Sequence, residues 1–314
     1  MTNFKTIVVN KDSHNLRLDK FIKKYFSNTP YSLIQKRIRL GLFKVNNLKK
    51  TPSFKVSYLD KLYYKNSDIF ISERSKNKNV PKSFLELLKK SIVFEDEFIL
   101  VLNKPYGIPV QGGSKINLSI DDALPYISEE TNTLKLTHRI DKNTTGILIT
   151  AKSKEIAKNI TRLFKVNKIK KVYYALVLGV PKKKNNLIKL PISKVNVNSF
   201  EKMKVTEDIS KQAITYYQTL ETKTNLSLIK IFPRTGRKHQ IRIHMLSENC
   251  PILGDKKYVL EKSIDDRFLD DNDYMHLHAK KIFFTLNKKS YSFNIQIPDF
   301  FLKTLKKYNF KNYN

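Results

Sequence analysis

The spacing of apolar residues changes near residue 90, and this change restricts the fold more than any other feature of the chain. Residues 16–26 and 31–41 carry apolar side chains at helical spacing, and the second segment stops at Gly41, a natural helix C-cap. Residues 42–47 and 61–64 have the composition of short strands. From Ile92 onward, short apolar runs alternate with turn residues, as in the strands of a large sheet. The chain therefore combines two differently built parts.

These patterns predict two domains, which is an ordinary number for 314 residues. We expect a small α+β domain at 14–72, a polar linker without periodicity at 73–88, and a larger domain at 89–314. In the larger domain, residues 147–152, 172–179, 226–233 and 282–286 have the pattern of strands, and 153–165 that of a helix. Strands and helices do not alternate strictly. The predicted fold class is α+β, with a mixed, mainly antiparallel sheet.

The formal net charge is +32, from 60 basic and 28 acidic residues, which favours a polyanionic partner such as nucleic acid or an anionic membrane surface. No apolar run approaches the roughly 18 residues of a spanning helix, so we expect no membrane insertion. The N-terminal stretch does not have the pattern of a signal peptide. Cys250 is the single cysteine, which excludes an intramolecular disulfide and a Cys-rich zinc site. We expect a cytoplasmic protein.

Only ten of the basic residues are arginine, and that scarcity makes their positions informative. Lysine supplies generic charge, whereas a planar fork that pairs with carboxylate or phosphate requires arginine. Arg234, Arg237 and Arg242 lie within nine positions, and Arg17, Arg37 and Arg39 cluster near the N-terminus. Residues 1–80 carry 18 basic and 5 acidic side chains, so they hold +13 of the net charge. Generic charge is therefore most dense in the predicted small domain.

Polar groups gather in three windows between strands, at 138–146, 171–179 and 234–244. A Gly-x-Ser-x-Gly elbow and a P-loop are absent from the sequence. The pairs His239/His244 and His276/His278 lack the neighbouring carboxylates of common zinc motifs, so we expect no metal. An isolated Asp141 in a turn is compatible with two roles. It can cap the loop, or it can act covalently or electrostatically on a glycosidic bond.

The segment HRIDKNTTGILITAK resembles the signature of the RluA family of pseudouridine synthases, which act on large ribosomal RNA and some transfer RNAs. KVYYALVLG and RTGRKHQIRIHM resemble the second and third motifs of that family, in the same order. The resemblance implies the pseudouridine synthase fold over the larger domain and an isomerase that uses neither metal nor organic cofactor. Ile140, Thr145 and Lys238 depart from the family pattern, but none of these changes removes a reacting group.

The resemblance also implies residue roles. Asp141 would be the nucleophile or charge stabiliser as uracil leaves the ribose and rejoins through C5. Arg242 would pair with Asp141 and keep its carboxylate charged. Tyr173 would stack on the target base and could serve in removing the C5 proton. Arg139 would fill the space that the flipped-out uridine leaves in the RNA.

The small domain resembles the RNA-binding domain of ribosomal small-subunit protein four, through RLDKFI, IRLG and FKVNN. The resemblance implies phosphate contacts through counterion release by a set of basic residues. They are Arg17, Lys20, Lys36, Arg37 and Arg39. Together with the motif resemblance, this domain implies large-subunit (23S) ribosomal RNA as the partner. No obligate protein partner is evident, and we expect a monomer.

Two other functions remain open from the sequence. The first is a ribosome-associated RNA-binding or assembly protein that has the fold without activity, against which the intact Asp141, Tyr173 and Arg242 argue. The second is a pseudouridine synthase acting on transfer RNA. The basic N-terminal domain favours a large folded RNA over a transfer RNA.

Overall fold

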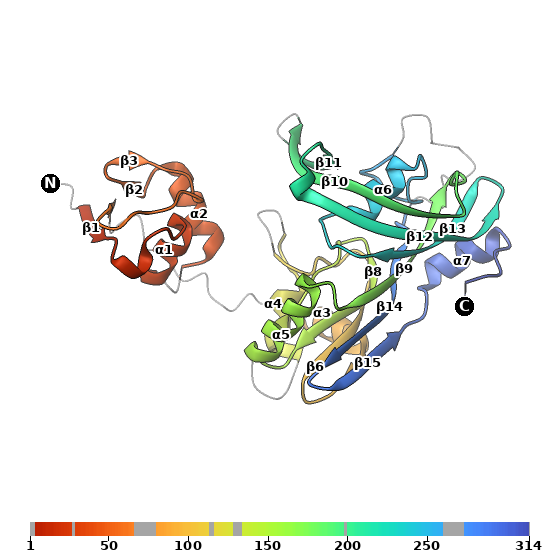
Figure 1. Ribbon diagram of the computed structural model, residues 1–314. Helices are drawn as coiled ribbons and strands as arrows, with labels where there is room; N and C mark the ends of the chain where they lie inside the picture. The colour runs from red at the N-terminus through yellow and green to blue at the C-terminus, as the bar shows by residue number, and fades with distance from the viewer. Residues whose placement is uncertain are drawn as a thin grey trace. The chain divides into compact units, whose positions relative to one another are not determined.

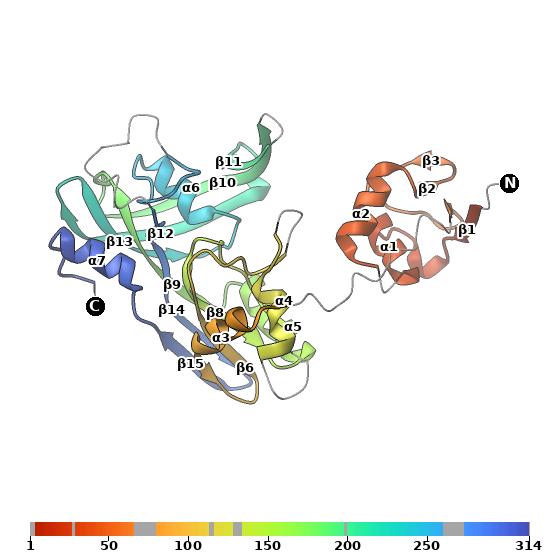
Figure 2. The same cartoon turned by 180° about the vertical axis from the view of Figure 1, so that it is seen from behind.

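The computed structural model describes residues 4–26, 29–65, 80–112, 116–127, 134–197, 200–259 and 273–313. The chain divides into two compact units, Met1–Lys78 and Asn79–Asn314. The structure is drawn in Figures 1 and 2. None of the helices in the described ranges is long and apolar enough to cross a membrane. Of the predicted linker, residues 73–79 lie outside the described ranges.

The first unit packs two helices, α1 (Leu18–Tyr25) and α2 (Tyr31–Leu40), against a small antiparallel sheet. The sheet order is β1-β4-β2-β3, with β1 (Phe4–Val8), β2 (Lys44–Val45), β3 (Leu48–Lys49) and β4 (Lys61–Lys65). Apolar side chains at helical spacing, such as Phe21 and Ile22, are buried in its core. Gly41 ends α2 with a φ of 78°, which confirms the predicted C-cap.

The second unit is built on one large sheet, with eleven strands in the described residues. Its strand order is β11-β10-β12-β13-β9-β14-β8-β6-β5, while β15 pairs with β14 and β7 with β8. The strand pairs are antiparallel except β14 with β8, which is parallel. The predicted α+β class with a mixed, mainly antiparallel sheet is confirmed. The strands are β5 (Ile92–Glu95), β6 (Ile99–Lys104), β7 (Lys135–Leu136), β8 (Thr145–Ala151), β9 (Lys170–Leu178), β10 (Asn185–Val197), β11 (Phe200–Val205), β12 (Gln212–Lys223), β13 (Leu226–Pro233), β14 (Leu277–Leu286) and β15 (Lys289–Asn294).

Helices cover the sheet at several places (Figures 1 and 2). The helices are α3 (Lys82–Lys90), α4 (Ile120–Ile127), α5 (Lys154–Lys165), α6 (Gln240–Ser247) and α7 (Asp299–Lys307). Helices α3, α4 and α5 gather beside β6 and β8, whereas α6 lies along β10 and β12. Ser153 begins α5 by accepting a hydrogen bond from the Ile156 amide, a typical N-cap.

Strand β8 is buried along its whole length, and this places the loop before it against the centre of the sheet. The loop carries Asp141 and reaches β8 through a turn in which the Thr144 amide donates to the Asp141 carbonyl. At Gly146 the backbone has a φ of 109°, and an added Cβ would lie 2.4 Å from the Ala279 carbonyl oxygen of β14. Only glycine fits there, because any side chain would force β8 and β14 apart.

The structure differs from the predicted linker between residues 82 and 88, which belong to helix α3. Phe84, Leu85 and Leu88 fall on one face of this helix and pack against the core formed by β6 and α4. Because the residues before Pro81 are mostly polar, this short amphipathic pattern was interpreted as part of the linker. The second unit therefore starts several residues earlier than the predicted boundary at 89.

Candidate active site

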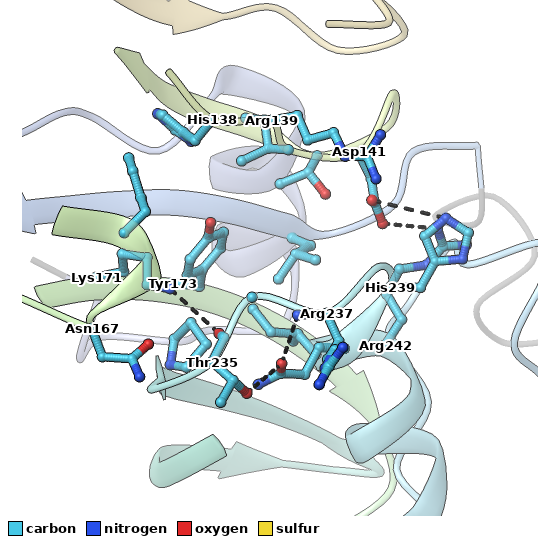
Figure 3. Close-up of a pocket in the computed structure, with 18 of the residues that line it drawn as sticks. His138, Arg139, Asp141, Asn167, Lys171, Tyr173, Thr235, Arg237, His239 and Arg242 are labelled. Atoms are coloured by element: carbon cyan, nitrogen blue, oxygen red, sulfur yellow. Dashed lines mark hydrogen bonds and ion pairs between the residues drawn. The ribbon is translucent and has the colours of Figure 1, made fainter. Parts of the chain in front are cut away.

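A cavity of about 690 Å³ lies in the second unit and collects residues from all three sequence windows. Figure 3 shows His138, Arg139 and Asp141 on the loop before β8, and Tyr173 and Lys171 from β9. Arg242 and His239 come from the start of α6. Residues more than 100 positions apart in the sequence thus share one cavity. Its size suits a small organic group such as a nucleoside.

Asp141 is hydrogen-bonded by Arg242, which is also paired with a second carboxylate, that of Asp255. Arg242 donates from Nε and Nη2 to the two carboxylate oxygens of Asp255, each at 2.7 Å. Its remaining nitrogen, Nη1, donates to Asp141 Oδ2 at 3.1 Å. Burial acts against charge on Arg242, but the bonds to Asp255 and Asp141 keep its pKa above the ordinary value. Asp255 therefore fixes the guanidinium plane, and Arg242 in turn orients Asp141.

Tyr258 packs against the same arginine, Arg242. Its ring centroid is 4.8 Å from the Arg242 guanidinium carbon, a cation–π contact. The Tyr258 hydroxyl lies 2.7 Å from Nδ1 of His239, whose Nε2 is 3.8 Å from Asp141 Oδ1. The Asp141 carboxylate is thus faced by two side chains, one toward each oxygen.

Tyr173 lies in the same cavity as Asp141. Burial and the charge of Asp141 raise the pKa of its hydroxyl, so the phenol is protonated at neutral pH. Two positions earlier on β9, Lys171 donates to the Thr235 carbonyl at 3.4 Å. Burial lowers the pKa of Lys171 to about 8. An aromatic ring, a carboxylate and a cation therefore line one pocket.

The buried Lys104 and the half-buried His138 anchor the Asp141 loop. Lys104 is fully buried, and its Nζ donates to the carbonyls of Pro105, Ile108 and Lys142 at 2.8 to 2.9 Å. Burial lowers the pKa of Lys104 to about 7, against the charge of Asp141, which raises it. His138 accepts the Ile149 amide through Nε2 at 2.9 Å, and burial lowers its pKa to about 3. The loop is therefore held by backbone contacts on both sides of Asp141.

The structure brings Asp141, Tyr173, Arg242 and Arg139 to the one cavity. Arg139 is exposed at its edge and forms no ion pair with another residue in the described ranges. In the first unit, Lys20, Lys36 and Arg39 have exposed side chains, and Arg37 is half-buried. Arg17 is instead engaged by Asp19, at 2.8 Å from Nη2 and 3.2 Å from Nε.

Histidines considered as metal ligands have other partners. His244, His276 and His278 each hydrogen-bond a threonine hydroxyl, at 2.8, 2.9 and 2.9 Å respectively. Within the described part of the chain, no three His, Cys, Asp or Glu residues lie close enough together to bind a metal. These histidines support the sheet and its helices.

Sequence reasoning missed several residues that form the site. Asp255 and Tyr258 belong to the segment Gly254-Asp255-x-x-Tyr258, and their contacts with Arg242 appear only in the fold. His239 stands within the third motif, immediately before α6. Lys104 is one of 50 lysines, and nothing in its neighbourhood marks it as buried.

A domain with a mainly antiparallel sheet, which holds an Asp–Arg pair and a tyrosine in a nucleoside-sized cavity, has the architecture of enzymes that isomerise uridine in RNA. The sequence matches the family described as RNA pseudouridylate synthase over residues 98–247. The chain belongs to this family and is an isomerase. The ribosomal large subunit pseudouridine synthase C of Rickettsia typhi is 33% identical over 298 residues, which cover 92% of this chain and 96% of that protein. Its counterpart from Buchnera aphidicola subsp. Baizongia pistaciae is 33% identical and covers 95% of both chains.

Solved structures support the same fold. Human RNA pseudouridylate synthase domain containing 4 has a TM-score of 0.63 and 28% identity, and the match covers 74% of this chain and 98% of that one. Human RNA pseudouridylate synthase domain containing 1 has a TM-score of 0.57 and 26% identity. The predicted family, fold and enzyme class are confirmed.

Proposed function

We propose that this protein converts specific uridines of large-subunit (23S) ribosomal RNA to pseudouridine, with Asp141 as the reacting carboxylate. The observation that carries the proposal is the contact between Asp141 and Arg242 at 3.1 Å inside the cavity that Tyr173 lines. The curated relatives named as large subunit enzymes match the chain over both units, which supports the choice of RNA. An Asp placed this way can act on a glycosidic bond without activating water.

In the reaction, the N1–C1′ bond of the target uridine breaks and a C5–C1′ bond forms. The C5 proton leaves and N1 gains a proton, so no atom is lost from the nucleotide. Asp141 acts at the breaking bond, as a nucleophile or as the counter-charge to the developing positive sugar. Arg242 keeps the carboxylate in place, and Asp255 keeps Arg242 from moving with it.

Tyr173 and Arg139 would make different contacts with the RNA. The raised pKa of Tyr173 keeps its proton on the hydroxyl, which favours stacking of its ring on uracil over action as a resident base. Arg139 is exposed at the cavity edge, where a long cationic side chain can occupy the gap that base flipping leaves. Both roles require the target uridine to leave its stack.

The first unit would dock the enzyme on folded RNA. Lys20 on α1 and Lys36 and Arg39 on α2 are exposed cations that attract phosphates and release counterions. Arg17 and Arg37 belong to the same proposed set, although Arg17 also holds Asp19. We propose that the enzyme acts in the cytoplasm as a monomer, without an obligate protein partner or an organic cofactor.

The test replaces Asp141 by the isosteric amide. Pseudouridine is mapped across total RNA in a strain that lacks the gene and carries wild type, Asp141→Asn or Asp208→Asn. Asp208 is an exposed carboxylate of the same unit and serves as the matched control. We expect wild type and Asp208→Asn to restore the same large-subunit sites, and Asp141→Asn to restore none. Restoration by Asp141→Asn, or sites confined to transfer RNA, would contradict the proposal.

A further inference from the structure

The carboxylate of Asp141 has a second neighbour whose role the proposed reaction leaves unassigned. Arg242 contacts Oδ2, whereas His239 presents Nε2 to the other oxygen, Oδ1, at 3.8 Å. Figure 3 shows both side chains reaching the same carboxylate. His239 has a φ of 56°, a left-handed conformation that costs free energy for a residue with a side chain. His239 therefore has a backbone conformation that is unfavourable for a residue with a side chain.

The hydrogen bonds around Tyr258 favour one of the two neutral tautomers of His239. The Met203 amide donates to the Tyr258 hydroxyl oxygen at 3.4 Å, so that oxygen already accepts a hydrogen bond. The Tyr258 O–H can then donate to His239 Nδ1, at 2.7 Å. With Nδ1 as acceptor, a neutral imidazole has its proton on Nε2. This is the nitrogen that faces Asp141.

Burial favours the neutral form of the His239 ring. The charged groups facing His239 are Asp141 from the loop before β8, Arg242 from α6, and Lys238 and Lys257. Burial lowers the pKa of His239 to about 4, with the three cations acting in the same direction and Asp141 against it. Burial also raises the pKa of Tyr258, so its hydroxyl keeps the proton it donates. His239 is thus an uncharged donor at neutral pH.

We propose that His239 is a positioning residue for Asp141, and that Tyr258 fixes the tautomer in which its Nε2–H points at Oδ1. The inference rests on the proposed function of Asp141. A distance of 3.8 Å closes to a hydrogen bond with a small movement, and such bonds often tighten only when substrate binds. With a donor on each oxygen, the carboxylate cannot rotate away from the sugar. Because His239 is neutral, it holds Asp141 without withdrawing its negative charge.

The test compares two replacements of equal length at His239. Gln offers an N–H near the position of Nε2, whereas Met has the same unbranched shape without a donor. Both carry the same strain at a positive φ, but only Gln can donate a hydrogen bond to Asp141. On unmodified large-subunit ribosomal RNA under single-turnover conditions with saturating enzyme, we expect His239→Met to slow pseudouridine formation about ten-fold. His239→Gln should stay within about three-fold of wild type, and RNA affinity should be unchanged in both.

Tyr258→Phe tests the tautomer, because it keeps the ring under Arg242 and removes the hydroxyl. We expect it to slow the reaction of wild type several-fold and to have no further effect in His239→Met, since coupled residues are not additive. Equal rates for Met and Gln at position 239, or additive effects of the two sites, would overturn the inference. A wild type that makes no pseudouridine in this RNA, or an active Asp141→Asn, would instead overturn the proposed function.

Discussion

Each unit contains an arginine that donates hydrogen bonds from two nitrogens to a buried aspartate. The two ion pairs differ in the other residues that they contact. In the first unit, Arg17 holds Asp19, which also accepts from Gln35 at 2.9 Å, and 44% of the Arg17 side chain is exposed. In the second, Arg242 holds Asp255 and keeps a third nitrogen for Asp141. Asp19 accepts hydrogen bonds from Arg17 and Gln35 in its own domain, whereas Asp141 accepts one from Arg242 and lines the cavity. A buried ion pair becomes part of an active site when one carboxylate is left incompletely satisfied.

The largest difference between the two pairs should appear on removal of the arginine. Arg242→Met leaves Asp141 and Asp255 without their shared cation, at a cost of about 3–5 kcal/mol in the free energy of unfolding. We expect the single-turnover rate to fall by about a thousand-fold or more, because Asp141, the proposed reacting carboxylate, loses its orientation. Denaturant titration and rate measurements check both effects. Arg237→Met is the control, since Arg237 lines the same cavity and its guanidinium bonds the Ser210 carbonyl and, within the described ranges, no carboxylate.

Replacement of the buried Lys104 tests whether the Asp141 loop depends on the Lys104 hydrogen bonds as much as on the Asp141–Arg242 ion pair. Lys104→Met leaves three carbonyls without their donor and should cost about 3 kcal/mol of stability. Thermal unfolding measures the loss, and activity should fall further than stability alone requires because Lys142 adjoins Asp141. Lys142→Met, which removes an exposed side chain but keeps the carbonyl, should be near wild type. A Lys104→Met enzyme with normal melting temperature and rate would show that the anchor is dispensable.

The pair in the first unit should respond to acid. Burial opposes ionisation of Asp19, but hydrogen bonds from Arg17 and Gln35 lower its pKa to about 2, from 3.8. The folded pKa lies below the unfolded one, so this stabilisation is full above about pH 4 and is lost as pH falls through 2. Asp19→Asn should remove about 2 kcal/mol at neutral pH and abolish that acid dependence. The measurement is urea unfolding followed by circular dichroism at each pH, with Asp12→Asn, an exposed residue, as control.

The smallest effect concerns the exposed cations of the first unit. Replacing Lys20, Lys36 and Arg39 together by Gln should weaken binding to large-subunit ribosomal RNA about ten-fold at moderate salt. The slope of log K against log salt should become shallower by about two to three, because up to three phosphate contacts are lost. Filter binding across a salt series measures both. The rate at saturating enzyme should not change, and an unchanged slope would exclude these residues from docking.

Motifs in the sequence pointed to Asp141, Tyr173 and Arg242, and the structure shows that these three residues line one cavity. The family resemblance predicted the pairing of Arg242 with Asp141, which the structure shows, but not its second carboxylate partner, Asp255. Lys104 was hidden for a different reason. Buried lysines are rare, and burial here depends on three carbonyls that loop geometry brings together.

Helix boundaries show the same limit. The helix predicted at 153–165 is confirmed as α5 (Lys154–Lys165), and the structure adds Ser153 as its N-cap. Helix α3 was assigned in part to the linker, because its apolar face covers nine residues beside a polar run and gains its stability from packing on the core. No role in the site could be assigned to His239 from the sequence. Its role depends on a left-handed backbone and on a tyrosine hydroxyl, and neither has a sequence signature.

The position of β14 in the sheet has a consequence for biosynthesis. This strand comes from residues 277–286, yet it lies between β9, which carries Tyr173, and β8, which follows the Asp141 loop. During translation the two sides of the site are made long before the strand that joins them. The cavity lining includes Leu277, the first residue of β14, so the cavity is complete only after this strand has been synthesised.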